Sequence, residues 1–281
     1  PERCTVWDTA CHHMVAVTQV SSINPFFELS AGSLRIFQRA VQCIAKLGRD
    51  AAVIFRPEEL VIHGADDGHS AASQFAFRRN FFRCTPSGSE ASIQQERRVV
   101  VQARGLAVAL RGSQQRTAEG LLIRLAGNRL VLEFMPRHGG KVRHKVPLLD
   151  TSPFLPGEPP AGPHAAALAP SLLARVLDHC VPGRSCEEVI VCAAPPQGLR
   201  VRVHDLMSSG DRDTFCTEVL VQMSDMEACS LGNGGAGGEV TIAGRGLRDF
   251  AKATDAIAKD LAHMGLLDGS ALLELHFGDQ G

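Results

Sequence analysis

The sequence predicts an α+β fold that consists of two copies of one domain. Its 281 residues correspond to about two domains of average size. Apolar residues make up 44% and charged residues 21% of the chain, close to the averages of globular proteins, so each half can bury a core. A proline-rich segment divides the chain, and the same order of helices and strands is predicted on both sides of it.

The proline-rich segment, residues 150–163, has the sequence DTSPFLPGEPPAGP and contains 5 of the 15 prolines. Neither a helix nor a central strand tolerates this density of proline, so an extended interdomain connector is predicted. The two domains are therefore placed at residues 23–149 and 164–281, with residues 1–22 as an N-terminal extension. The glycine-rich residues 232–238 lack the Gly-Lys-Ser/Thr ending of a phosphate-binding loop and are predicted to be a flexible connection.

The first domain begins with an amphipathic helix, predicted over residues 31–47. Leu34, Phe37, Val41 and Ile44 recur at helical spacing, and Gly48 ends the helix. The elements expected after it are strands at 51–55, 60–63, 71–77 and 99–102, a helix at 103–111, and strands at 121–125, 129–135 and 142–148. A tight turn at 126–128 is expected to join the first two strands of this final meander.

The second domain repeats this order after the connector. Ser171 is expected to cap its first helix. The predicted elements are a helix at 171–179, strands at 189–192, 199–204, 215–222 and 239–243, a helix at about 246–263, and a strand at 271–277. Because counterparts of the last two strands of the first domain are missing, we expect the second sheet to be incomplete and to have an open edge.

The charges and cysteines restrict the class of function. Residues 1–150 contain 20 basic and 13 acidic residues, whereas residues 151–281 contain 9 and 17, which indicates a polyanionic partner or docking of unlike surfaces. Nine cysteines, without any Cys-x-x-Cys pair, indicate reduced thiols in or near the core, and the spacing of His179, Cys180, Cys186 and Cys192 is not that of a zinc site. No apolar run approaches the ~20 residues needed to cross a bilayer, so a soluble intracellular protein is expected, with no metal or cofactor.

Basic residues form one face of each predicted helix. On a helical projection Arg35, Arg39 and Lys46 lie opposite the apolar residues of the first helix, which contains no acidic residue. The last helix repeats this separation, although acidic residues flank its basic ridge; an ordinary solvated face is the alternative for both helices. Arginines on the two short helices add to the pattern, which predicts a surface for phosphate backbones without base specificity.

Several segments together resemble the Rad-nine family, subunits of the nine-one-one DNA-damage checkpoint clamp and relatives of the sliding clamp PCNA. They include FELSAGSLRIFQRAVQCIAKLG, SAASQFAFRRNFF and HKVPLLD in the first domain, and RVRVHDL, TEVLVQMSDMEACSL, LRDFAKATDAIAKDLA and LELHFGD in the second. The resemblance covers roughly residues 26–278. Residues 1–22 have no counterpart in the family, and its long phosphorylated tail has no match in these 281 residues.

The resemblance implies a DNA clamp fold, with antiparallel sheets outside and two helices per domain on the inner side. It implies a nuclear, non-enzymatic subunit that forms a heterotrimeric ring with two other clamp subunits around double-stranded DNA, is placed there by a clamp loader, and binds repair enzymes through their clamp-binding peptides. The residues expected to face DNA are Arg35, Arg39, Lys46, Arg104, Arg111, Arg175, Arg245, Arg248, Lys252 and Lys259.

The family also implies a client-peptide groove, near the loop 63–69 with its residues His63 and His69 and near connector residues Phe154 and Leu155. Two alternatives remain open at this point. The segment from His63 to His69 also contains Asp66 and Asp67, which together could hold a metal for phosphodiester hydrolysis, although the same residues suit a polar turn. A homotrimeric replicative clamp is the second alternative, because the opposite charges of the two halves are compatible with self-docking as well as hetero-docking.

Overall fold

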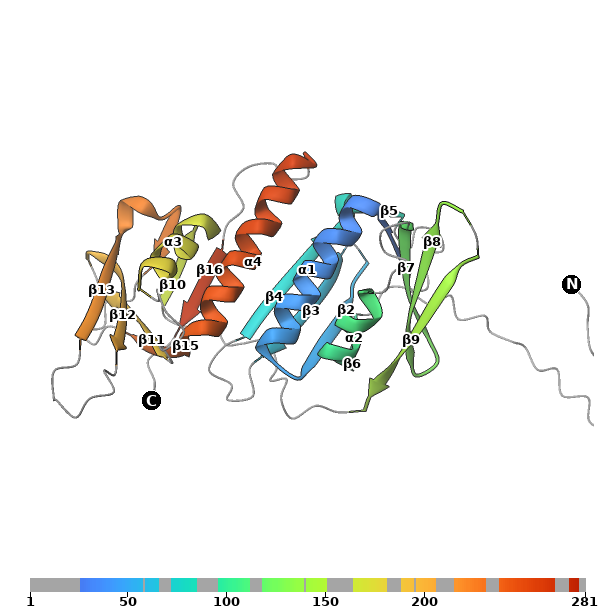
Figure 1. The fold of residues 1–281 in the computed structure, drawn as a ribbon, viewed down its shortest axis with the longest axis horizontal. Coiled ribbons are helices and arrows are strands. Elements are labelled where there is room, and N and C mark those ends of the chain that lie inside the picture. The colour runs from blue at the N-terminus through green and yellow to red at the C-terminus, as the bar shows by residue number, and fades with distance from the viewer. Residues whose placement is uncertain are drawn as a thin grey trace, which may run out of the picture.

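The computed structural model describes residues 26–57, 59–65, 72–84, 96–111, 118–138, 140–150, 164–180, 188–194, 196–205, 215–230, 238–265 and 273–277. The predicted extension, residues 1–22, and nearly all of the predicted connector lie outside these ranges. Within them the predicted α+β architecture of two consecutive, similarly built domains is confirmed (Figure 1).

The first domain contains one continuous antiparallel sheet. Its elements are β1 (Phe26–Ser30), α1 (Ala31–Leu47), β2 (Asp50–Phe55), β3 (Glu59–Ala65), β4 (Ala72–Arg78), β5 (Phe82–Cys84), β6 (Arg97–Gln102), α2 (Ala103–Leu110), β7 (Ala118–Ala126), β8 (Arg129–Pro136) and β9 (Val142–Leu149). The nine strands are ordered β4-β3-β2-β6-β9-β8-β7-β1-β5. The hairpin β8–β9 therefore joins the part of the sheet built around β2 to the part built around β7.

Helix α1 packs closely against this sheet because its apolar face is buried and because the strand beneath it contains a glycine. The Ser33 amide donates a hydrogen bond to the Ser30 hydroxyl oxygen at 3.1 Å, which caps the N-terminus of the helix. The predicted apolar face, including Phe37 and Ile44, is fully buried. A Cβ atom at Gly64 of β3 would stand 2.5 Å from Ile44 Cγ2, so the absence of a side chain at Gly64 allows α1 to approach β3.

The second domain repeats the order but has two separate sheets. Its elements are β10 (His164–Leu168), α3 (Pro170–Cys180), β11 (Glu188–Ala194), β12 (Gly198–Asp205), β13 (Phe215–Gln222), β14 (Ala228–Ser230), β15 (Glu239–Ala243), α4 (Gly244–His263) and β16 (Leu273–Phe277). One sheet has the order β14-β10-β16 and the other β13-β12-β11-β15. In the first domain the hairpin β8–β9 connects the two parts of the sheet, but no described strand fills this place between β15 and β16. Each of these two strands therefore has one unpaired edge, as the sequence predicted.

One predicted helix start was wrong. Helix α3 begins at Pro170, so Ser171 lies inside its first turn and does not precede it as a cap. Proline is suited to the first helical position because its fixed φ matches the helix and its missing N–H would have no intrahelical partner there. The Leu172 and Leu173 amides donate to the Ala169 carbonyl oxygen at 2.9 and 3.4 Å, which confirms that the helix starts earlier.

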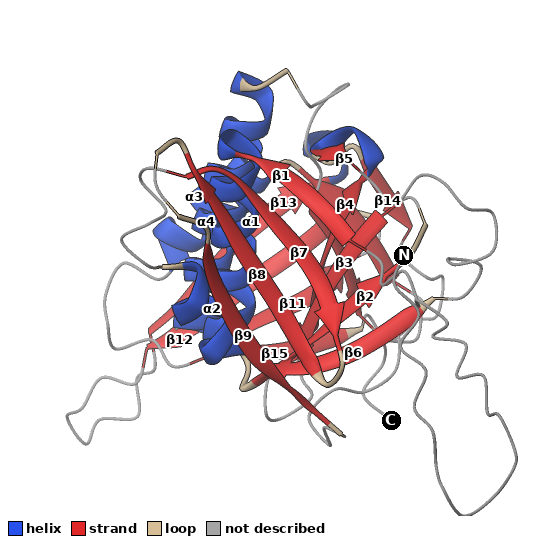
Figure 2. Cartoon of the chain, turned by 90° about the vertical axis from the view of Figure 1, so that its right-hand side faces the viewer, coloured by secondary structure: helices blue, strands red, loops and turns tan. Residues whose placement is uncertain are grey.

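The four α-helices of the described residues form a layer on one side of the molecule. They pack side by side in the order α3, α4, α1, α2 along the long axis (Figure 1), and the view from the end shows most of the strands on the other side of them (Figure 2). Helix α4 reaches both cores, because its residue Ala251 is buried in the core of the second domain and its residue Ile257 in that of the first. None of the helices in the described part of the chain has the length and apolar composition needed to span a bilayer.

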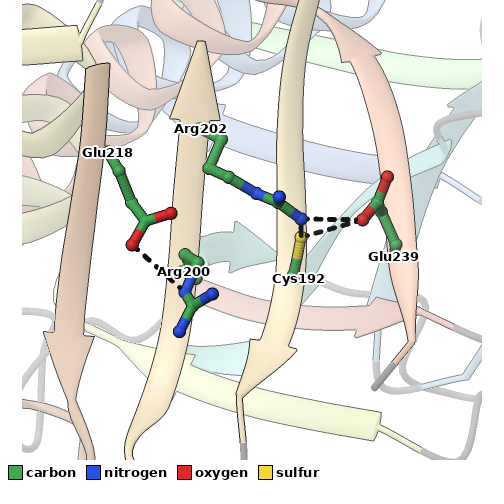
Figure 3. Close-up of polar contacts among 5 residues, drawn as sticks. All are labelled: Cys192, Arg200, Arg202, Glu218 and Glu239. Carbon is green, nitrogen blue, oxygen red and sulfur yellow. Dashed lines mark hydrogen bonds and ion pairs between the residues drawn. The ribbon is translucent and has the colours of Figure 1, made fainter. Parts of the chain in front are cut away.

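Cys43, Cys180, Cys192 and Cys229 are free thiols. Cys43 and Cys180 are buried in the two cores, and burial raises the pKa of the Cys43 thiol to about 11. Cys192 alternates along β11 with the core residues Val191 and Ala193 and so lies on the opposite face of the β13-β12-β11-β15 sheet. There Arg202 Nη2 donates to Cys192 Sγ and to Glu239 Oε2, both at 2.9 Å (Figure 3). Burial also raises the pKa of the Cys192 thiol, so both groups are protonated at neutral pH and are poor nucleophiles.

Candidate nucleic-acid interface

The basic side chains predicted to face DNA all project from the helical layer. They are Arg35, Arg39, Lys46, Arg104, Arg111, Arg175, Arg245, Arg248, Lys252 and Lys259. Nine of them are exposed and Arg248 is half-buried, while Arg111 directly follows the last residue of α2. The packing of each helix against its sheet explains this exposure, since the apolar face takes the buried side and leaves the basic residues on the other.

Carboxylates of the second domain bind two of the basic residues of α1. Arg39 Nη1 donates to Asp260 Oδ2 and also to the Ala256 carbonyl oxygen at 3.3 Å. Lys46 Nζ lies 3.4 Å from Asp249 Oδ2. Both acidic residues belong to α4, which runs antiparallel to α1 across the boundary between the domains.

The lysines of α4 are paired as well. Lys252 Nζ lies 2.6 Å from Asp178 Oδ1 on α3, and Lys259 Nζ lies 2.7 Å from Asp255 Oδ2 one turn earlier on α4. The side chains of Lys252 and Asp178 are about half exposed, at 49% and 50%. Exposed ion pairs of this kind stabilise a protein by only about 0–1 kcal/mol, so another anion can compete for the cation.

Five arginines have no acidic partner among the described residues. They are Arg35, Arg104, Arg111, Arg175 and Arg245. Each of the four helices supplies at least one of them, so these unpaired arginines extend along the whole helical layer. A guanidinium group offers five N–H donors in a planar arrangement that matches the oxygens of a phosphate. The arrangement therefore provides separated contacts for a long polyanion.

Phenylalanine, tyrosine and tryptophan side chains are not exposed on the described part of this surface. The exposed large apolar side chains of the described residues are Val108, Leu220, Met223 and Met264, none of which is aromatic. The large aromatic rings on which proteins commonly stack the bases of single strands are therefore not exposed there. The surface suits a duplex backbone better than unstacked bases.

The predicted client groove and the alternative metal site are not supported at His63. That residue lies within β3 and its side chain is 4% exposed, whereas the sequence placed it at the start of a loop. Strand β3 continues to Ala65 because it pairs with β4, His63 being opposite Gln74. The other residues of the two sites, Asp66, Asp67, His69, Phe154 and Leu155, lie outside the described residues. Within those ranges, no group of three or more histidine, cysteine or acidic residues is arranged to hold a metal ion.

Three of the four ion pairs described in the helical layer could not be predicted from the sequence. Asp249, Asp255 and Asp260 flank the basic ridge of the last helix. The partners of Asp249 and Asp260 lie on α1, more than 200 positions away in the chain, whereas Asp255 pairs with Lys259 only four positions later. The role of Asp178 as an ion-pair partner could not be predicted, because a single acidic residue on a short helix forms no recognisable pattern. The packing of α4 against α1 and α3 brings Arg39, Lys46 and Lys252 to their acidic partners.

The fold is that of a sliding-clamp subunit. The structure matches PCNA from Thermococcus kodakaraensis, TK0582, with a TM-score of 0.57 at 14% identity over 91% of this chain and 90% of that one. The PCNA2–PCNA3 complex of Sulfolobus tokodaii matches with a TM-score of 0.57 at 12% identity over 91% and 90% of the two chains. PCNA from A. fulgidus, solved with the C-terminal region of FEN-1 bound, matches with a TM-score of 0.56 at 14% identity over 91% of this chain and 88% of that one.

Within the class of sliding-clamp subunits, the sequence identifies the family of this chain. The Rad9 family profile matches residues 37–269, and the chain belongs to that family. No curated protein shows significant similarity to the chain. The family and the fold are those of non-enzymatic scaffold proteins.

Proposed function

We propose that the chain is one subunit of a heterotrimeric DNA clamp that encircles duplex DNA without reading its sequence and acts in the DNA-damage checkpoint and in repair. The observation that carries the proposal is the set of unpaired arginines, to which every helix of the layer contributes. The helices themselves lie together on one side of a clamp fold (Figure 2). Such groups bind by neutralising phosphates and releasing counterions, which gives affinity for any sequence. Family membership supports the checkpoint role.

Strand edges at the two ends of the molecule support assembly into a ring. Strand β13 is an edge strand of its sheet and lies at one end of the molecule (Figure 1). At the other end β9 pairs with β8 over most of its length but with β6 only through Leu148 and Leu149. Open edges offer unpaired backbone groups to another strand, and unlike ends that join head to tail generate closed rings.

The similarity to clamp structures suggests the kinds of partner. One similar structure is a complex of two different PCNA subunits, and another contains a segment of FEN-1. By analogy, we expect this chain to assemble with two other checkpoint clamp subunits, to require a clamp loader, and to bind repair enzymes through short peptides. Because the proposed ligand is chromosomal DNA, its expected location is the nucleus.

Replacing Arg35, Arg104 and Arg111 with alanine tests the DNA contact. The purified chain would be titrated against a short fluorescent duplex of arbitrary sequence, with anisotropy measured over a series of salt concentrations. The slope of log K against log salt is expected to become shallower by up to about 0.9 for each lost phosphate contact, or about 2.7 for the three.

The matched control removes the same charge from the strands. Arg83, Arg97 and Arg129 are exposed residues of β5, β6 and β8, and their replacement with alanine is expected to leave the slope nearly unchanged. Equal slopes for the two triple variants would contradict a DNA contact through the helical layer.

Assembly is tested by the mass of the protein in solution and by the chains that purify with it. We expect no homotrimer of this chain by light scattering, and two different clamp-fold chains in a pull-down from its own cells. Leu220 of β13 is 40% exposed, so Leu220→Glu is expected to reduce this co-purification without unfolding the domain. Val108→Glu, at an exposed aliphatic residue of α2, is the matched control. A uniform homotrimer would instead favour a replicative clamp.

A further inference from the structure

The acidic residues of the helical layer all come from the second domain. Helix α1, helix α2 and the adjacent Arg111 contribute five basic residues and no acidic one. Helices α3 and α4 contribute five basic and four acidic residues, the latter being Asp178, Asp249, Asp255 and Asp260. The helical layer is therefore strongly cationic on the first domain and nearly neutral on the second.

Each of these aspartates binds a basic residue that the sequence placed on the DNA-facing surface. The pairs are Arg39 with Asp260, Lys46 with Asp249, Lys252 with Asp178, and Lys259 with Asp255. The side chains of Lys46 and Lys259 remain 60% and 72% exposed while they are paired. A phosphate can thus reach the same ammonium groups, but it must displace a carboxylate that is already there.

The ion pairs are not what holds α4 against α1. Ile257 of α4 is buried in the core of the first domain, and the ring of Phe250 packs 6.1 Å from that of Phe75 on β4. The Met264 side chain also lies within 3.0 Å of where a Cβ atom of Gly32 would stand. Since apolar packing already joins the helices, the exposed carboxylates between them are available for another role.

We propose that these four aspartates act as intramolecular competitors of the DNA phosphates. A lysine or arginine that is already neutralised by a carboxylate releases no counterion when a phosphate replaces that carboxylate, so its contribution to affinity is small. The DNA contact then depends mainly on the five unpaired arginines and stays weak, which suits a ring that must move along a duplex. This inference rests on the function proposed above.

Replacing Asp249 and Asp260 together with asparagine tests the proposal. Asparagine keeps the size of the side chain and removes its charge, which frees Arg39 and Lys46 on α1. In the same anisotropy titration of the purified chain with the fluorescent duplex, we expect tighter binding and a slope steeper by up to about 1.8, or 0.9 for each cation released.

A charge-matched control separates local competition from a general gain of positive charge. Glu119 pairs with Arg137 at 3.6 Å and Glu218 with Arg200 at 3.3 Å, both pairs lying on strands or beside them (Figure 3 shows the second). Replacing Glu119 and Glu218 with glutamine adds the same charge and also frees two arginines. If this control steepens the slope as much as Asp249→Asn with Asp260→Asn does, the inference is overturned. The proposed function would fail separately, through an unchanged slope in the Arg35, Arg104 and Arg111 variant.

Discussion

Replacing Ile257 with alanine is expected to lower the free energy of unfolding by about 2–5 kcal/mol, the range for removing a buried isoleucine, leucine or methionine side chain. Ile257 is 7% exposed and belongs to α4 of the second domain, but it packs into the core of the first. The substitution leaves a cavity at the contact between the two domains. We therefore also expect the urea unfolding curve, followed by circular dichroism, to separate into two transitions as the domains lose their coupling.

The control for this prediction is Val108→Ala. Val108 is 67% exposed on α2, and a surface substitution of this kind is expected to change stability by less than about 0.5 kcal/mol. If Ile257→Ala destabilises the protein no more than Val108→Ala does, α4 does not connect the two cores in the way described.

Replacing Gly198 with alanine is the second change with a large expected effect. Gly198 starts β12 with φ of 138°, a conformation that other residues rarely adopt. A Cβ atom there would stand 2.1 Å from the Val221 carbonyl oxygen of β13, so the strand itself would have to move. We expect a loss of roughly 3 kcal/mol or more in the free energy of unfolding, from backbone strain and steric overlap together.

Gly127→Ala provides the matched control for Gly198→Ala. Gly127 also has a positive φ, 57°, in the turn between β7 and β8, but a Cβ atom there would meet nothing within 4 Å. Only backbone strain remains, and the expected loss in the free energy of unfolding is about 1 kcal/mol.

The two substitutions should also differ in partner binding. Because Gly198 positions the open edge of β13, its substitution should abolish co-purification of partner chains, whereas that of Gly127 should not. Equal thermal shifts for the two variants would contradict the close contact between Gly198 and β13.

Much of the fold follows from local patterns in the sequence. The bounds predicted for α1, β13 and β15 coincide with those in the structure, because apolar periodicity, a terminal glycine or a flanking loop defines each of them. The turn at Gly127 was predicted correctly for the same reason. These features depend on residues that are neighbours in the chain.

Four of the described strands, β1, β5, β10 and β14, were not predicted from the sequence. Strand β1 has only five residues, and β5 and β14 have only three each. Strand β10 consists of His-Ala-Ala-Ala-Leu, and alanine has little intrinsic preference for a strand. It is extended because β14 and β16 hydrogen-bond to its two edges. His63 was misplaced for a related reason, since pairing with β4 lengthens β3 beyond its apolar residues.

The sequence alone determined that each helix presents cations on the side away from its core, because the 3.6-residue period separates apolar from basic residues within a single element. Only the tertiary structure decided which of these cations are available to a ligand. Arg39 and Asp260 are 221 positions apart, and Lys46 and Asp249 are 203 positions apart. Ion pairing acts over a few ångströms in space and is independent of distance along the chain, so it is established only when α4 packs against α1.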